Sequence, residues 1–403
     1  MDKKITIGLF IDTYFPMIDG VTMVVDNYAR RLTNYANVIV FAPKMFRKNY
    51  DDTKLPYKVV RCKSMGLPFL DYSLPMPKLD RKFMKELKNY KLDIVHIHSP
   101  ATIGKLGIHY AKKHNIPVIA TMHSQYRQDI KRAVKLDFLA EIINHKLMKI
   151  IFNKCDECWA VNSEVARIFY EEYKCCKKPR VMNNATEMMP IENIDEATKF
   201  IRNKYNIKED EKILLFVGRL NALKNIFLIV DSLKILKNKN PKFKFKMLFV
   251  GNGQDEEQLK KSIKDNDMQD EIILCGRETN REILAKYYAS ADLFLFPSLY
   301  DASSIVQIEA ASQKTPGLFV EGAATTATIN NNINGYIVEN DANKYADKIK
   351  DIMDNKEQYN SVCENAYRQI YINWDKKINE VYNLYLKIID NKKSEGESIE
   401  KNI

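Results

Sequence analysis

Two carboxylates eight positions apart, Asp301 and Glu309, are the side chains of this sequence whose spacing best suits chemistry. An apolar, strand-like run (292–296) leads into a loop that carries Asp301, and a helix-like run that carries Glu309 follows. A strand that passes into a helix in this way directs unpaired backbone N–H groups and the positive end of the helix dipole at one point, which suits a phosphate. Carboxylates beside it can accept hydrogen bonds from sugar hydroxyls. The segment therefore indicates a sugar attached to a phosphate; an ordinary βα turn with two solvated acids is the alternative.

A second segment upstream carries two cations next to a strand end. The apolar run 212–217 is typical of a buried parallel strand, and Gly218, Arg219 and, five residues after Arg219, Lys224 follow it. Arginine offers a planar fork of donors and lysine a point charge, and together they suit a diphosphate better than a single carboxylate. Since the chain has 63 lysines and arginines, a pair of unrelated surface cations is the alternative for this segment alone. Taken together, the two segments favour a nucleoside diphosphate sugar.

Four motifs resemble the donor-binding half of the family 4 retaining glycosyltransferases of GT-B fold: GRLNALKN (218–225), VGNGQDEEQLKK (250–261), CGRETNREILAKYYASADLFLFPS (275–298) and YDASSIVQIEAASQKTPG (300–317). The first half of the chain carries IGLFIDTYFPMIDGVTMVVDNYARRL, DIVHIHSPATIG and IPVIATMHSQYRQDI, which resemble the acceptor half of the same family. Relatives with similar segments include enzymes that glycosylate diacylglycerol and others that build capsular polysaccharide. The resemblance implies an α/β protein with two doubly wound Rossmann-like domains that face each other across a cleft.

The alternation of strand-like and helix-like runs is itself typical of βαβ units, with six strand-like runs in each half. Because single cores stop growing near 250–300 residues, 403 residues predict more than one domain. The segment between Thr186 and Ala197 has neither a strand nor a helix pattern and marks the expected boundary. We expect an acceptor-binding domain at 1–190, a nucleotide-sugar-binding domain at 191–370, a helix at 371–390 that crosses back to the first domain, and a disordered polar tail at 391–403.

The resemblance assigns donor-site roles by matching motifs. Arg219 and Lys224 match the pair that holds the donor diphosphate, and Asp301 matches the first acid of the paired-acid motif, where the family usually has Glu. Glu309 matches the second acid, which binds the ribose hydroxyls. The resemblance implies three further donor contacts. The helix start at Ser304, Ile305 and Val306 would contact the distal phosphate, and the turn at Gly276 and Arg277 would contact the base. Gly20, which directly follows Asp19, would contact the diphosphate. The expected catalytic residues are His123, Asp301 and Lys224.

On the acceptor side, His123 matches a family histidine near the transferred sugar, which could orient the 6-hydroxyl or assist deprotonation of the acceptor. The expected acceptor-side residues are His98, Ser124 and Tyr126. His96, two residues before His98 on the same side of its strand, is expected to be a core residue. For each histidine at a strand end, a packing role is the alternative.

No cofactor and no metal are expected, because the nucleotide sugar is itself a substrate. Cys155 and Cys158 form a CxxC pair, but Cys175 and Cys176 are adjacent, which is not the spacing of a second zinc pair, so we expect buried thiols. The DxD tripeptide at 265–267 follows a charged helix and not a strand, so a solvated helix end is expected. Seven cysteines, an odd number, argue against a disulfide framework.

The net charge of +11 and a basic, partly apolar stretch at 131–154 favour weak contact with an anionic membrane surface, although the helix in that stretch could instead pack on the sheet. No apolar run reaches the roughly 18–20 residues that cross a bilayer and no signal sequence is visible, so a cytoplasmic location is expected, with peripheral contact at the cytoplasmic face of the membrane as a further expectation. The expected partners are a nucleotide-sugar donor, with a UDP-sugar favoured, and a lipid or glycan acceptor. A GT-B-like nucleotide-sugar epimerase is the alternative; a nucleic-acid binder has only the charge in its favour, since the cations are dispersed.

Overall fold

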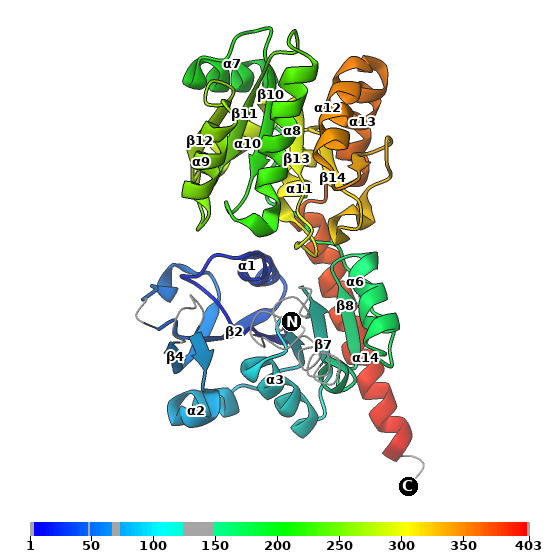
Figure 1. The fold of residues 1–403 in the computed structure, drawn as a ribbon. Helices are drawn as coiled ribbons and strands as arrows, with labels where there is room; N and C mark the ends of the chain where they lie inside the picture. Colours follow the sequence, from blue (N-terminus) through cyan, green and yellow to red (C-terminus); the bar gives the residue numbers. More distant parts are fainter. Residues whose placement is uncertain (1–3, 47–48, 67–72, 124–147, 401–403) are drawn as a thin grey trace. The chain divides into compact units, whose positions relative to one another are not determined.

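The structure is a computed structural model that describes residues 4–46, 49–66, 73–123 and 148–400. The chain forms two compact units, each described here by itself (Figure 1). Unit 1 comprises Met1–Asn184 together with Trp374–Ile403, and unit 2 comprises Ala185–Asn373. The chain therefore leaves unit 1 next to the segment that lacks a strand or helix pattern, and its last helix returns to unit 1.

Unit 1 is built on a parallel sheet of seven strands in the order β3-β2-β1-β6-β7-β8-β9. The strands are β1 (Thr6–Phe10), β2 (Asn37–Pro43), β3 (Lys58–Cys62), β6 (Ile94–Ile97), β7 (Val118–Met122), β8 (Glu157–Ala160) and β9 (Arg180–Val181). Nearly every residue of the central strands is buried, as expected for a parallel sheet covered on both faces. The sequence patterns found six of these strands. They missed the two-residue edge strand β9, whose residues are both exposed.

Among the described residues, the named helices of unit 1 are α1 (Gly20–Leu32), α2 (Arg81–Asn89), α3 (Thr102–Lys113), α6 (Ser163–Arg167) and α14 (Trp374–Glu400). Short 3-10 helices η1 (Asp52–Lys54) and η2 (Pro77–Leu79) and a π-helix η3 (Ile168–Glu172) accompany them. Helix α14 packs against α1, and α3 packs on β1, β6 and β7. A small antiparallel pair, β4 (Ser64–Gly66) and β5 (Ser73–Pro75), lies outside the main sheet and was not predicted.

The prediction of a disordered tail from 391 is wrong for residues 391–400, because α14 continues as a helix to Glu400. The ammonium of Lys392 lies 2.8 Å from the carboxylate of Asp156, which ties the added turns to the body of unit 1. Lysine and glutamate are also good helix formers, so a polar composition alone did not exclude a helix here.

Unit 2 is built on a parallel sheet of six strands in the order β12-β11-β10-β13-β14-β15. The strands are β10 (Lys212–Val217), β11 (Phe245–Val250), β12 (Ile272–Gly276), β13 (Leu293–Phe296), β14 (Gly317–Val320) and β15 (Tyr336–Val338). All six were predicted to within one residue at each end. Their apolar side chains form the centre of one continuous core.

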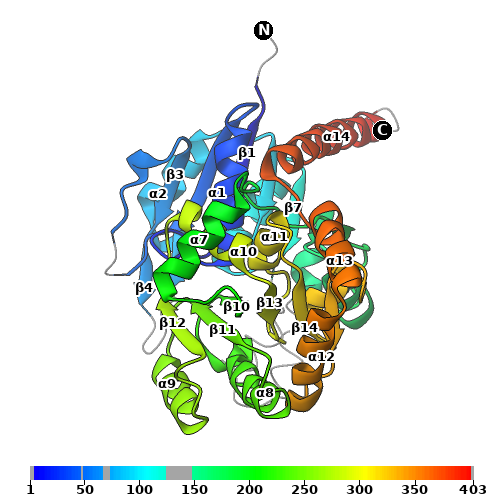
Figure 2. The same ribbon diagram turned by 90° about the horizontal axis from the view of Figure 1, so that it is seen from above.

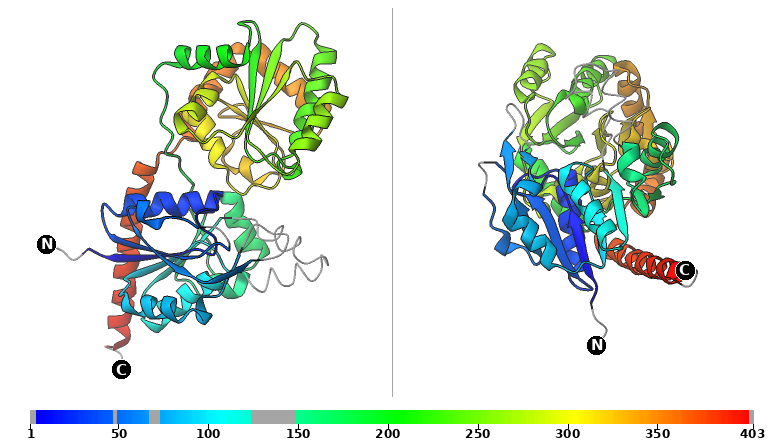
Figure 3. Two further views of the ribbon diagram at one scale, coloured as in Figure 1. Left: turned by 90° about the vertical axis from the view of Figure 1, so that its left-hand side faces the viewer. Right: turned by 90° about the horizontal axis from the view of Figure 1, so that it is seen from below.

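Helices cover both faces of this sheet (Figure 3). They are α7 (Ile194–Tyr205), α8 (Ile226–Lys239), α9 (Glu256–Asp265), α10 (Arg281–Ser290), α11 (Ile305–Ser312), α12 (Ala342–Asp354) and α13 (Lys356–Gln369), with short turns η4 (Ala222–Lys224) and η5 (Ala324–Thr328). Helices α9, α8 and α12 pack side by side as one layer. Helices α7, α10 and α11 form a row in the other layer (Figure 2), so the unit is doubly wound as predicted.

Candidate active site

The strand order of unit 2 reverses direction between β10 and β13, which are hydrogen-bonded neighbours. From β10 the chain proceeds outward through β11 and β12, and it then returns to β13 on the other side of β10. In doubly wound sheets ligands bind at such a reversal, at the carboxyl ends of the strands. The two segments singled out by the sequence, 218–224 after β10 and 297–304 after β13, both lie at this point.

An ion pair between Lys224 and Asp301 joins the two segments directly. The Lys224 ammonium lies 2.5 Å and 2.6 Å from the two carboxylate oxygens of Asp301. Both side chains are less than a fifth exposed, at 16% and 18%. The ammonium also lies 5.7 Å from the centre of the Phe296 ring, at the end of β13. The structure therefore brings together two of the three residues expected to be catalytic.

The loop after β10 is shaped by close contact with the loop after β11. The Leu220 N–H donates to the Asn252 carbonyl at 2.9 Å. A Cβ at Gly251, where φ is +151°, would lie 1.9 Å from the Gly218 carbonyl oxygen, and a Cβ at Gly253 would lie 2.1 Å from that of Leu220. Only glycine fits at these two positions, because the backbone of the other loop occupies the space of a side chain.

The two arginines expected in the donor site, Arg219 and Arg277, are both exposed. Arg219 directly follows Gly218 at the end of β10, next to the loop that carries Lys224. Arg277 follows Gly276, which ends β12 with φ +73° and so forms a turn that favours glycine. Both guanidinium groups are therefore accessible to a ligand at the carboxyl edge of the sheet.

Helix α11 begins where the sequence predicted it to begin. Ser304 is the N-cap, and its side chain makes no capping hydrogen bond. The N–H groups of Ile305 and Val306 have no intrahelical acceptor, as at any helix start, whereas the Gln307 N–H donates to the Ser304 carbonyl at 3.3 Å. Seven other α-helices of the described chain, for example α1 and α10, are capped by an Asp or Asn side chain. The start of α11 thus keeps its N–H groups and the positive end of its dipole available to an anion.

Glu309 lies one turn into α11 and is buried, with a side chain only 4% exposed. Its Oε1 accepts a hydrogen bond from Arg281 at 2.6 Å, and its Oε2 accepts one from the Tyr288 hydroxyl at 3.0 Å. The carboxylate expected at the ribose is therefore already engaged by two side chains of α10. The sequence motifs did not single out either partner.

In unit 1 the strand order reverses between β1 and β6. The Asp12 carboxylate after β1 accepts from the Ile103 N–H at 2.7 Å, at the start of α3, and from the Ser99 hydroxyl at 2.8 Å. Asp19 caps α1 by accepting from the Thr22 N–H at 2.7 Å. Gly20 is the first residue of α1, and a Cβ built there would meet no atom within 4 Å. Packing within unit 1 therefore does not require glycine at position 20.

Three histidines lie together at the carboxyl ends of β6 and β7. His98 Nδ1 and His123 Nε2 are 2.9 Å apart and share a hydrogen bond. His96 is fully buried and bonded on both sides, to Tyr385 of α14 and to Thr121, each at 2.6 Å. The prediction of His96 as a core residue is confirmed, whereas His98 contacts His123 directly. Burial lowers the pKa of His123 to about 3 and that of His98 well below its usual range, so both rings are neutral near pH 7.

Some expectations fall outside the described residues, namely Ser124, Tyr126 and most of the basic stretch 131–154. Within the part of the chain that the structure describes, no group of three or more His, Cys, Asp or Glu side chains is arranged to hold a metal ion. Cys155, Cys158 and Cys175 are buried, and burial raises the pKa of each thiol. The described helices also include none long and apolar enough to span a bilayer.

Sequence reasoning missed residues whose role depends on distant contacts. Arg281 and Tyr288 reach Glu309 from another helix, and Tyr385 reaches His96 from the far end of the chain. Gly251 and Gly253 did carry a local signal, a GxG directly after a strand, that could have marked a close approach of two loops.

Two family models match the chain, and together they span most of it. One is described as Glycosyltransferase Family 4 and matches residues 18–187; the other is described as Glycosyl transferases group 1 and matches residues 197–369. With both regions matched, the chain belongs to the family 4 glycosyltransferases, and it is a glycosyltransferase of GT-B fold.

Individual relatives agree with this family. The chain is 28% identical over 324 residues to an alpha-monoglucosyldiacylglycerol synthase of Streptococcus pneumoniae, covering 77% of this chain and 70% of that protein. A glycosyltransferase structure from Rickettsia africae matches with a TM-score of 0.77 at 20% identity, covering 97% and 100% of the two chains. The Anabaena protein HepE, solved in complex with UDP and glucose, matches with a TM-score of 0.73 at 11% identity, covering 95% and 100%. The predicted GT-B fold is therefore confirmed.

Proposed function

We propose that this glycosyltransferase moves a hexose from a nucleoside diphosphate sugar to a lipid or glycan acceptor, with retention of the anomeric configuration and without a metal ion. The observation that supports this most is the convergence of the Lys224–Asp301 ion pair with the uncapped start of α11 where the strand order reverses. That arrangement combines a cation and helix N–H groups for phosphates with a carboxylate for sugar hydroxyls.

The residues of unit 2 would divide the donor between them. Lys224 and Arg219 would neutralise the charge that grows on the departing nucleoside diphosphate, and the first N–H groups of α11 would bind its distal phosphate. Asp301 would hold hydroxyls of the sugar, and Glu309 those of the ribose. Asp301 is one methylene shorter than the glutamate usual in the family, which bears on which hexose fits.

His123 would orient the transferred sugar rather than exchange a proton. Its pKa of about 3, lowered by burial, makes it a poor general acid and a weak base near neutral pH. A neutral imidazole can still donate or accept a hydrogen bond, for which the 6-hydroxyl of a hexose is a suitable partner. The acceptor proton would then pass to an oxygen of the leaving diphosphate on the same face of the sugar. This front-face step needs no protein nucleophile and gives retention.

The first experiment is a thermal-shift panel of UDP- and GDP-sugars. A ligand at a hundred times its dissociation constant adds about 2.7 kcal/mol of stability, so the true donor should stand out. The donor is then incubated alone and followed by nuclear magnetic resonance. If the donor is converted to an epimer in the absence of an acceptor, the protein is an epimerase and the proposed transfer reaction is refuted. Turnover that persists after treatment with EDTA supports metal independence, and turnover that is lost and then restored by Mg²⁺ or Mn²⁺ refutes it.

A diacylglycerol-type lipid is the first acceptor to test, because the Streptococcus pneumoniae relative is named for a glucosyldiacylglycerol product. The net charge of +11 would draw the protein to an anionic surface. Co-sedimentation with phosphatidylglycerol vesicles, compared with phosphatidylcholine vesicles at low and high salt, tests that contact. Absence of binding to anionic vesicles at low salt would remove the membrane from the proposal and leave a soluble glycan as the acceptor.

A further inference from the structure

The buried carboxylate of Glu309 is held by two donors of different kinds. Arg281 donates to Oε1 through Nη2 at 2.6 Å, and the Tyr288 hydroxyl donates to Oε2 at 3.0 Å. Each oxygen of a carboxylate offers about two lone-pair positions, so one position on each oxygen remains. Because both oxygens accept hydrogen bonds from side chains of α10, these two donors fix the plane of the Glu309 carboxylate and so the direction of its remaining lone pairs.

Both donors come from one face of α10. Arg281 is its first residue and Tyr288 follows seven positions later, two turns along the same face. The Asn280 side chain accepts from two first-turn N–H groups and so fixes the helix start. The Tyr288 ring is fully buried and lies edge-on to Phe294 of β13, with ring centres 5.8 Å apart. The donors are therefore placed by the core of unit 2 rather than by a mobile surface chain.

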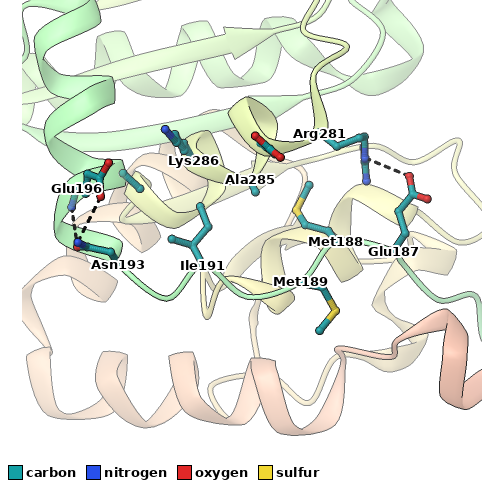
Figure 4. A pocket seen from close by; sticks show the side chains of 11 residues that line it. Glu187, Met188, Met189, Ile191, Asn193, Glu196, Arg281, Ala285 and Lys286 are labelled. Carbon is teal, nitrogen blue, oxygen red and sulfur yellow. Dashed lines mark hydrogen bonds and ion pairs between the residues drawn. The ribbon is translucent and has the colours of Figure 1, made fainter.

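Arg281 has a second anchor on its other side. Its Nε lies 3.4 Å from a carboxylate oxygen of Glu187, at the wall of a surface cavity of about 340 Å³ (Figure 4). The guanidinium thus bridges two carboxylates, one buried and one accessible. Burial is the largest single effect on Arg281 and lowers its pKa, but Glu309, Glu187 and Tyr288 together raise that pKa by more. Burial raises the pKa of Tyr288, so both side chains stay protonated donors.

We infer that Arg281 and Tyr288 are positioning residues that aim the Glu309 carboxylate at the vicinal 2′- and 3′-hydroxyls of the donor ribose. This inference rests on the proposed function, in which Glu309 binds the ribose. A carboxylate free to rotate would have to be ordered when the nucleotide binds, and that cost would weaken the complex. Two fixed donors remove this cost in advance.

The test compares nucleotides that differ only in the ribose hydroxyls. UDP and 2′,3′-dideoxy-UDP, with GDP and dideoxy-GDP in parallel, are titrated calorimetrically into wild type, Arg281→Gln, Tyr288→Phe and Glu309→Gln. Hydrogen bonds to charged groups are worth enough for about a 10- to 100-fold change in affinity. We expect each of the three variants to lose about tenfold or more for the ribonucleotide and less than twofold for the dideoxynucleotide. The conservative variant Arg281→Lys should recover part of the loss.

Lys286→Gln is the matched control, since it removes a cation from the same helix and the same cavity wall without a contact to Glu309. It should bind both nucleotides like wild type. Equal loss for ribo- and dideoxynucleotides in Arg281→Gln, or no loss for either, would overturn the inference while the wild-type enzyme still binds its donor. If wild type binds neither ribonucleotide, the proposed function and this inference fail together. Should Tyr288→Phe unfold, Arg281→Gln decides alone, because the arginine side chain is 42% exposed.

Discussion

Replacing Lys224 by Met would separate the chemical from the structural part played by the ion pair with Asp301. Methionine keeps most of the length of the side chain and removes its charge. Two unit charges 2.6 Å apart attract by about 6 kcal/mol at an effective dielectric constant of 20. Desolvation of both groups offsets most of that, so a net coupling of about 2 kcal/mol is expected for side chains less than a fifth exposed.

The assay is a double-mutant cycle with Lys224→Met, Asp301→Asn and the double variant, each followed by thermal unfolding and by turnover. Lys224→Met should lower the melting temperature of unit 2 by about 4–8 °C. The double variant should be no less stable than Lys224→Met, since the pair is already broken. Turnover should fall about 10²–10³-fold in Lys224→Met, because one preorganised charge contact to the leaving group is lost.

The chain offers a close control on the same two strands. Lys212 and Asp292 form an ion pair at 2.9 Å at the opposite, amino ends of β10 and β13, with side chains 45% and 21% exposed. Lys212→Met should cost about 0.5 kcal/mol and leave turnover unchanged. A coupling below about 0.5 kcal/mol for the Lys224 pair, or turnover in Lys224→Met within threefold of wild type, would refute the reasoning.

Three further predictions follow from the same geometry. Burial lowers the pKa of His123 to about 3, against 6.5 when unfolded, so folding becomes less favourable as the pH falls below 6.5. Between pH 8 and pH 5 the free energy of unfolding, measured in urea, should therefore fall by about 2 kcal/mol more in wild type than in His123→Gln. The control His109→Gln, at an exposed position, should lose as much as wild type, and equal losses in all three proteins would contradict the burial argument. Gly251→Ala should lower the melting temperature sharply or prevent folding, because its Cβ would overlap a carbonyl oxygen. Gly20→Ala, where a Cβ meets no atom, should melt like wild type but show a raised KM for the donor. An unchanged KM would remove Gly20 from the donor site. Arg219→Ala should weaken nucleoside diphosphate binding about tenfold in calorimetry without a change in melting temperature, and unchanged affinity would remove it from the diphosphate clamp.

The family and the GT-B fold were predicted from the resemblance of the motifs that follow the strands. Most strands could be predicted from local sequence, because a parallel strand buried on both faces is a short continuous apolar run wherever it occurs. The loop that carries Asp301 and the helix start at Ser304 were predictable for the same reason: strand, loop and helix follow one another within about twelve residues. The helical end of α14 was not, since a polar composition does not by itself distinguish a helix from a disordered tail. There Lys392 pairs with Asp156, more than two hundred positions away.

Residue types and their spacing by themselves determined which side chains could hold a diphosphate and a sugar. Only the tertiary structure decided what those side chains contact. It paired Lys224 with Asp301 across 77 positions, engaged both oxygens of Glu309 through α10, and buried His98 and His123 against each other so that both stay neutral. Such contacts depend on the strand order of the sheet and on burial, and neither quantity can be read from the neighbours of a residue along the chain.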